Sequence, residues 1–119
     1  MAKVPPEVDP EDAVWSHLYT LSAFCYRKAA FEPGENVAVV GLGVLGLGAV
    51  ALGPLFGARV VALGNSSVRM EMALRMGAHK VFMSSDPDLA EKLDQFTDGV
   101  GIDLVILTAN PWPAYRTSV

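Results

Sequence analysis

The stretch Asn36–Ala58 reads NVAVVGLGVLGLGAVALGPLFGA and decides the fold of the chain. It contains 23 residues without a charge, six of them glycines. About 20 apolar residues can cross a bilayer as one helix, so the stretch is long enough for a membrane span. The alternative is a short buried strand that turns, through glycines, into a helix beside a bound phosphate.

The membrane interpretation fits the sequence poorly. Six glycines and Pro54 make a weak single helix, and Pro54 predicts a kink or an early end there. No cluster of Lys or Arg flanks the stretch to set an orientation. A membrane span also leaves unexplained why the following sequence keeps alternating between strand-like and helix-like segments. We therefore expect no membrane as a partner.

The nucleotide interpretation explains the glycines one by one. GLGVLG fits the pattern G-x-G-x-x-G directly after the β-rich run Val37–Val40. Gly41 permits a tight turn, Gly43 lets the backbone approach a pyrophosphate, and Gly46 lets the helix pack closely on the strand. The predicted cofactor-binding turn therefore consists of Gly41, Leu42, Gly43, Val44, Leu45 and Gly46.

Strands and helices alternate along the rest of the chain. The predicted strands are Val37–Val40, Arg59–Leu63, Lys80–Met83 and Ile102–Thr108, and the helices end near Phe56, span Ser66–Met76, and run from Asp86 to about Phe96. Such alternation predicts parallel pairing through right-handed crossovers. The fold class is α/β, a partial Rossmann fold of about four parallel strands with flanking helices.

A helix is predicted ahead of this core. The sequence DPED at 9–12 opens it, with Asp9 as the cap, and it extends to about residue 30. An apolar stripe at helical spacing predicts its buried face. The stripe consists of Val14, Leu18, Leu21, Cys25 and Ala29.

Composition narrows the function classes. The 119-residue chain has a formal net charge of −4, which argues against nucleic acid as its main partner. Its single cysteine, Cys25, excludes an internal disulfide and fits a reducing compartment, so we expect a cytoplasmic protein. No apolar segment follows Lys3, so we expect no secretory signal.

Residues 33–82, from PGENVAVVGLG through RMGAHKVF, resemble the cofactor domain of medium-chain, zinc-type alcohol dehydrogenases. The resemblance continues through DGVGIDLVILTAN at 98–110. It implies an oxidoreductase that transfers hydride between a nicotinamide and an alcohol or carbonyl, with zinc only in the complete enzyme. Family members have a catalytic domain before this region and two further strands after it.

The resemblance therefore divides the chain into two parts. Residues 1–35 form an entry segment and helix that lead from a missing catalytic domain, and residues 36–119 form a partial dinucleotide-binding domain. We expect no turnover by this chain alone. A fourth strand left at the sheet edge predicts pairing with a second copy through Ile102–Thr108, or contact with the missing domain. The alternative function is a truncated, non-catalytic module for dinucleotide binding or interaction.

The second strand favours NADP over NAD, although both stay open. NAD sites usually carry Asp or Glu at its end, where this chain has Gly64 followed by Asn65 and Ser66. Arg69, one turn on, could pair with a 2′-phosphate, or it could only solvate a helix face. The resemblance adds Ser84 beside the adenosine, and the general rule for open α/β sheets adds Thr108 and Asn110. The predicted cofactor residues outside the turn are Gly64, Asn65, Ser66, Arg69, Ser84 and Thr108.

No catalytic residue is predicted. His17 matches a position at which relatives hold a zinc ligand, but a catalytic zinc needs three protein ligands. The other two would come from a segment outside this chain. A partly buried helix histidine is the favoured alternative for His17.

Overall fold

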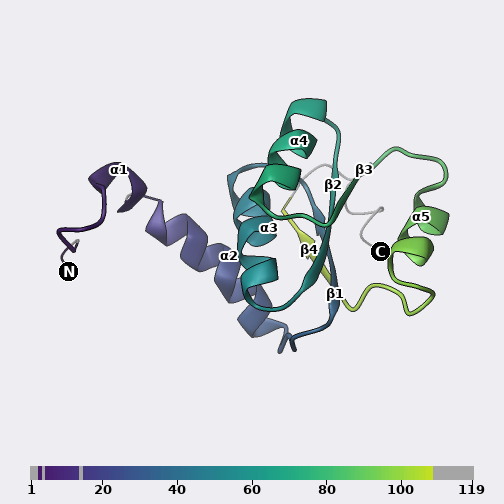
Figure 1. The fold of residues 1–119 in the computed structure, drawn as a ribbon, viewed down its shortest axis with the longest axis horizontal. Helices are drawn as coiled ribbons and strands as arrows, with labels where there is room; N and C mark the ends of the chain where they lie inside the picture. The colour runs from purple at the N-terminus through teal and green to yellow at the C-terminus, as the bar shows by residue number, and fades with distance from the viewer. Residues whose placement is uncertain (1–2, 4, 14, 109–119) are drawn as a thin grey trace.

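The computed structural model describes residues 3, 5–13 and 15–108, which form one sheet with helices on both faces (Figure 1). The strands are β1 Asn36–Val40, β2 Arg59–Gly64, β3 Lys80–Met83 and β4 Leu104–Leu107. The helices are α1 Pro10–Ala13, α2 Ser16–Lys28, α3 Val44–Leu55, α4 Ser67–Met76 and α5 Leu89–Phe96. The predicted alternation is confirmed, and α3 ends one residue after Pro54.

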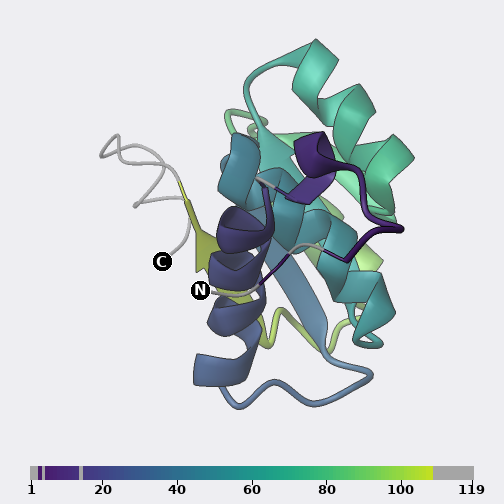
Figure 2. The ribbon, with the colours of Figure 1, turned by 90° about the vertical axis from the view of Figure 1, so that its left-hand side faces the viewer.

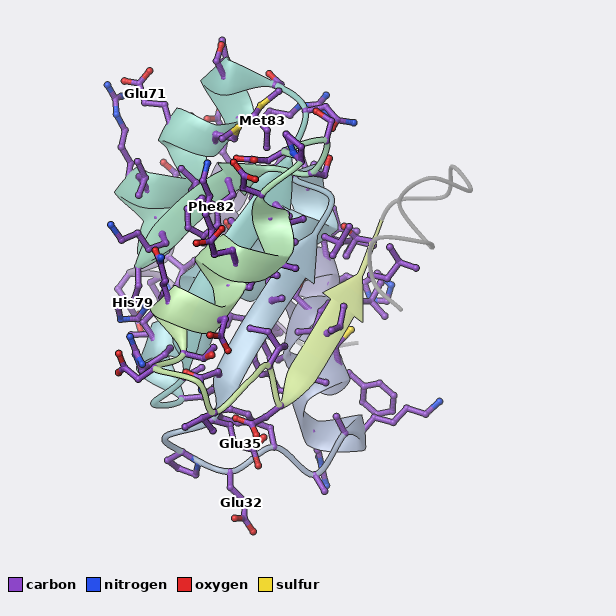
Figure 3. The ribbon with its side chains drawn as sticks, turned by 90° about the vertical axis from the view of Figure 1, so that its right-hand side faces the viewer. Glu32, Glu35, Glu71, His79, Phe82 and Met83 are labelled. Atoms are coloured by element: carbon purple, nitrogen blue, oxygen red, sulfur yellow. The ribbon has the colours of Figure 1, made fainter. Side chains whose placement is uncertain are left out.

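The sheet has the order β3-β2-β1-β4, and all three strand pairs are parallel. The predicted fold class is therefore confirmed. Parallel pairing brings the carboxyl ends of the four strands to one edge of the sheet, where open α/β sheets bind their ligands. Within the described residues β4 is an outer strand, with α5 lying in front of the sheet in Figure 3.

Apolar residues of β1 and β2 belong to two hydrophobic clusters, one on each face of the sheet. Val37 and Val39 belong to the cluster that includes residues of α2, α3 and α4. Ala38 and Val40 belong to the cluster that includes Phe96 of α5. Because helices cover both faces, β1 is buried along its whole length, which explains its uninterrupted apolar sequence.

The single helix expected from Asp9 to residue 30 is wrong. Asp9 does act as a cap, since its Oδ1 accepts a 2.9 Å hydrogen bond from the N–H of Glu11. However, α1 ends at Ala13, and α2 begins only at Ser16. Because α1 buries no residue, no tertiary packing holds its short turn in line with α2.

The predicted buried stripe of α2 is also wrong in its register. Leu21 is 42% exposed and Cys25 is exposed, whereas Ser22 and Tyr26 are buried. Figure 2 shows α2 lying beside α3, and the glycine-rich surface of α3 explains the difference. A small residue and a hydroxyl-bearing ring fit against that surface, while the aliphatic stripe turns outward.

Asn36–Ala58 therefore forms a strand, a turn and a helix of 12 residues. Among the helices that the structure describes, none combines the length and the apolar character that crossing a membrane requires.

Candidate functional site

The glycine turn connects β1 to α3 at the carboxyl edge of the sheet. Gly41 has φ of +95°, a backbone conformation that residues other than glycine rarely adopt. Its N–H donates to the carbonyl of Leu63 at 3.0 Å, which ties the turn to β2. Gly43 then caps α3 with φ of −78°. Strand, turn and helix thus follow the order that the sequence predicts.

The space in front of the turn fits a phosphate group. A Cβ built on Gly43 meets no protein atom within 4 Å, so the open side of this residue faces free space. In the described part of the chain, the N–H groups of Leu42 and Gly43 donate no hydrogen bond to a protein acceptor. Free N–H groups beside the positive end of a 12-residue helix form a suitable environment for a pyrophosphate.

Gly46 is required for a different reason. A Cβ on Gly46 would lie 1.8 Å from the carbonyl oxygen of Gly41 and 2.9 Å from the hydroxyl oxygen of Thr108. The first turn of α3 therefore approaches the end of β1 more closely than any side chain would permit. This contact places the N-terminus of α3 directly at the turn.

The remaining turn residues divide between core and surface. Leu42 is buried, at 4% exposure, whereas Val44 and Leu45 are 54% and 37% exposed. The Cδ1 atom of Leu42 would lie 2.8 Å from a Cβ on Gly64. Leu42 thus fills the space beside the end of β2, and its side chain is not accessible to a ligand.

The residues predicted to hold the ribose meet at the ends of β2 and β3. The hydroxyl of Ser84 donates to the Oδ1 of Asn65, and the N–H of Ser84 donates to the carbonyl of Gly64 at 3.0 Å. Ser66 caps α4, because its Oγ accepts a 3.4 Å hydrogen bond from the N–H of Arg69. Figure 3 labels Met83 at this end of β3. These polar groups thus lie on the same edge of the sheet as the glycine turn.

Thr108 also lies at this edge, directly after β4, and its hydroxyl donates to the carbonyl of Gly41 at 2.9 Å. It therefore contacts the turn. Asn110, the other residue predicted there, lies outside the described residues.

His17 is exposed on α2. In residues 3, 5–13 and 15–108, no group of three His, Cys, Asp or Glu side chains is arranged to hold a metal ion. These described residues do not by themselves form a zinc site.

Sequence reasoning missed the hydroxyl groups that join α2 to α3. Ser22 donates to the carbonyl of Leu45 at 2.9 Å, and Tyr26 donates to the carbonyl of Ala49 at 2.6 Å. Burial, followed by a smaller effect of Cys25, raises the pKa of Tyr26 well above its usual range. Because both acceptors are backbone carbonyls of α3, 23 residues further along the chain, the residue types at those positions gave no signal.

The sheet order and the glycine turn define a Rossmann-type α/β protein with a dinucleotide-binding arrangement. The family model described as zinc-binding dehydrogenase matches residues 44–119. The chain belongs to this family of zinc-type, medium-chain dehydrogenases.

Three relatives illustrate the similarity. The chain is 33% identical over its full length to the NADP-dependent isopropanol dehydrogenase of Entamoeba histolytica, of which it covers 33%. It is 35% identical over 87% of its length to the L-galactonate-5-dehydrogenase of Escherichia coli, of which it covers 31%. The structure of zinc-dependent alcohol dehydrogenase 2 from Streptococcus pneumonia matches 98% of the chain with a TM-score of 0.88 and 27% identity, and the chain covers 34% of it. The chain spans about a third of the length of the curated relatives it matches.

Proposed function

We propose that this chain is the NAD(P)-binding part of a zinc-type, alcohol dehydrogenase-like oxidoreductase. The observation that carries the proposal is the free space at Gly43, in front of the N-terminus of α3 and of N–H groups that donate to no acceptor in the part of the chain that the structure describes. In this arrangement Gly41–Gly46 would hold the pyrophosphate. The bound nicotinamide would supply hydride transfer with an alcohol or carbonyl.

The ends of β2 and β3 support NADP as the preferred dinucleotide. Gly64 leaves the end of β2 without a carboxylate that would repel a 2′-phosphate. Ser66 and the exposed Arg69 offer a hydroxyl and a cation near that position, beside Asn65 and Ser84. The relative from Entamoeba histolytica is named as NADP-dependent, which points the same way.

The proposal extends to the organisation of the complete enzyme. We propose that residues 1–35 lead from a catalytic domain and that residues 36–119 form the dinucleotide-binding domain. Zinc would then be bound largely by that other domain, with His17 as a candidate ligand. Partner contacts would form along β4, through that domain or through a second copy. A cytoplasmic location is supported by the single free thiol.

The test is a calorimetric titration of the chain with NADPH and NADH, repeated on Gly43→Asp. Asp is favoured as a helix cap, so this variant should fold as well as the wild type while placing a carboxylate in the phosphate space. We expect its NADPH affinity to fall at least about tenfold, or about 1.4 kcal/mol. Val100→Asp adds the same charge at a residue that is 75% exposed in the loop before β4, and it should bind normally.

Two further measurements test the preference for NADP and the assignment of the chain as a cofactor-binding part. Arg69→Ala should weaken NADPH binding more than NADH binding, and equal losses would remove the case for NADP. Turnover of secondary alcohols by the chain alone would contradict its assignment as the cofactor part. Binding without turnover fits both the cofactor part of a larger enzyme and a non-catalytic dinucleotide module. Binding of neither dinucleotide by the folded wild type would reject both.

A further inference from the structure

The end of β4 is hydrogen-bonded to the glycine turn through one residue. The backbone N–H of Thr108 donates to the carbonyl of Val40 at 2.9 Å and continues the pairing of β4 with β1. The Thr108 hydroxyl oxygen lies 2.9 Å from the carbonyl oxygen of Gly41 and 3.2 Å from that of Val40. Its single proton is therefore shared between two backbone oxygens, with the shorter contact to Gly41.

The two peptide groups on either side of the Gly41 Cα are hydrogen-bonded to different strands. The group before it bonds to β2, and the group after it bonds to the residue that follows β4. The Gly41 N–H donates to Leu63, and the Gly41 carbonyl accepts from Thr108. A trans peptide is planar, with its C=O and N–H pointing in opposite directions. Fixing the Gly41 carbonyl toward Thr108 therefore fixes the direction of the Leu42 N–H as well.

This direction matters because the Leu42 N–H is one of the turn amides that donate to no acceptor among the described residues. Without the Thr108 hydroxyl, Gly41 would be less restrained in its left-handed conformation, because glycine populates positive and negative φ about equally readily. A Cβ on Gly46 would lie 1.8 Å from the same carbonyl oxygen, so α3 closely approaches the Gly41 peptide on another side. The hydroxyl opposes rotation of the carbonyl away from β4.

We propose that Thr108 is a positioning residue that aligns the turn amides for the pyrophosphate. It acts through the Gly41 peptide, and it has no second hydroxyl proton to donate to the dinucleotide. The proposal rests on the dinucleotide-binding function proposed above. It assigns Thr108 a role different from the direct cofactor contact that its position in the sequence predicts.

The experiment compares Thr108→Val, which keeps the shape and removes the hydroxyl, with Thr108→Ser, which keeps the hydroxyl. Two quantities are measured on each full chain. One is the NMR order parameter of the Gly41, Leu42 and Gly43 amides without ligand, and the other is the dissociation constant for NADPH. In Thr108→Val we expect the order parameters to fall from about 0.85 toward about 0.6. Its affinity should drop about 5- to 20-fold, and Thr108→Ser should restore both quantities.

Thr97→Val is the matched control. Thr97 is 1% exposed and its hydroxyl joins Leu93, Asp94 and Gly101, in the segment that precedes β4. This variant should lower the stability of the fold while leaving the turn order parameters and the NADPH affinity unchanged. A general loss of stability is thereby distinguished from a loss of alignment.

The outcomes separate the two proposals. If the wild type binds no dinucleotide, the proposed function fails, and so does the alignment of a cofactor by Thr108. If the wild type binds and Thr108→Val binds equally well, the positioning role alone is overturned. Unchanged order parameters in Thr108→Val overturn it too, whatever the affinity. Loss of both quantities in Thr108→Val and their recovery in Thr108→Ser support it.

Discussion

The ring nitrogen Nδ1 of His79 accepts a 3.0 Å hydrogen bond from the backbone N–H of Val60. The backbone N–H of His79 donates in return to the carbonyl of Val60 at 2.8 Å. The His79 side chain thus provides an acceptor for the backbone N–H of Val60, a strand residue that is fully buried and has no access to water. Figure 3 labels His79 just before β3. The two bonds fix where the pairing of β2 with β3 begins, and with it the register that brings Gly64 beside Met83.

We therefore predict that His79→Ala lowers the free energy of unfolding by about 1–3 kcal/mol, because a buried N–H loses its acceptor. His79→Asn offers an acceptor oxygen close to the position of Nδ1 and should recover most of the loss. His17→Ala, at an exposed position of α2, should change stability by less than about 0.5 kcal/mol. Urea unfolding of the three variants measures these values. Equal losses for Ala and Asn at position 79 would show that the acceptor is unimportant.

The second and third glycines of the turn, Gly43 and Gly46, should respond to different extents to the same substitution. In the first turn of a helix, alanine is intrinsically preferred over glycine by about 1 kcal/mol. At Gly46 the added Cβ would meet the Gly41 carbonyl oxygen at 1.8 Å, so we predict that Gly46→Ala destabilises by about 1–3 kcal/mol or more. At Gly43 nothing lies in the way, and Gly43→Ala should cost less than about 1 kcal/mol. Thermal unfolding of both variants gives the comparison, and a stable Gly46→Ala would contradict the close approach of α3.

Much of this site could be predicted from the sequence because its determinants are local. Gly41 and Gly46 each meet a separate steric requirement, and Gly43 leaves open space between them, so their spacing within six residues indicates a turn between a strand and a helix. The parallel pairing of the strands followed in the same way from short apolar runs separated by helical segments. Patterns with a fixed short period carry this kind of information.

The features that escaped prediction depend on a partner far away in the sequence. The buried face of α2 is set by α3, where a Cβ on Gly48 would lie 2.7 Å from the hydroxyl oxygen of Ser22. Spacing within α2 cannot reveal that its neighbour has room only for small groups. In the same way, the position of Thr108 indicated the ligand edge. Its acceptor on Gly41 lies 67 residues earlier in the chain.

The loop before α5 should lose stability in acid through one carboxylate. Asp86 accepts a hydrogen bond from the ammonium of Lys92 and a 2.8 Å bond from the N–H of Asp88. The Lys92 bond, and then the Asp88 bond, hold the pKa of Asp86 below its usual value. The Lys92 ammonium also lies 5.8 Å from the centre of the Phe82 ring, labelled in Figure 3.

Because the folded pKa of Asp86 is lowered, the ionised carboxylate contributes to the stability of the fold. This contribution is fully present above the unfolded pKa of about 3.9 and is lost as pH falls below that value. We predict that Asp86→Asn lowers the urea midpoint at pH 7 and flattens the decline of stability below about pH 4. Asp94→Asn removes an exposed carboxylate of α5 and should keep the wild-type acid profile. Parallel acid profiles for wild type and Asp86→Asn would rule out this contribution.

The alkaline end of the stability profile should depend on Tyr26. Its ring is 2% exposed, packs edge-on against Phe31 and Phe56 with centroids 5.3 and 5.4 Å away, and its hydroxyl donates to Ala49. Burial raises the pKa of this hydroxyl, so the folded state disfavours the phenolate. Stability is therefore unaffected by this group below the unfolded pKa of about 10, and it falls as pH rises above that value.

Tyr26→Phe separates the two effects of that hydroxyl. At pH 7 the variant loses one buried hydrogen bond, and we predict a decrease of about 0.5–1.5 kcal/mol in the free energy of unfolding. Above about pH 10, Tyr26 ionises in the unfolded wild type, which lowers the free energy of unfolding of the wild type but not of Tyr26→Phe. The difference in free energy of unfolding between the two proteins should therefore narrow as pH rises. Tyr19→Phe changes a tyrosine that is 41% exposed and should follow the wild type throughout. Urea unfolding between pH 7 and pH 11 makes the comparison. A difference that stays constant over this range would mean that the Tyr26 phenolate is tolerated in the folded state, against the burial that the packing of α2 on α3 imposes.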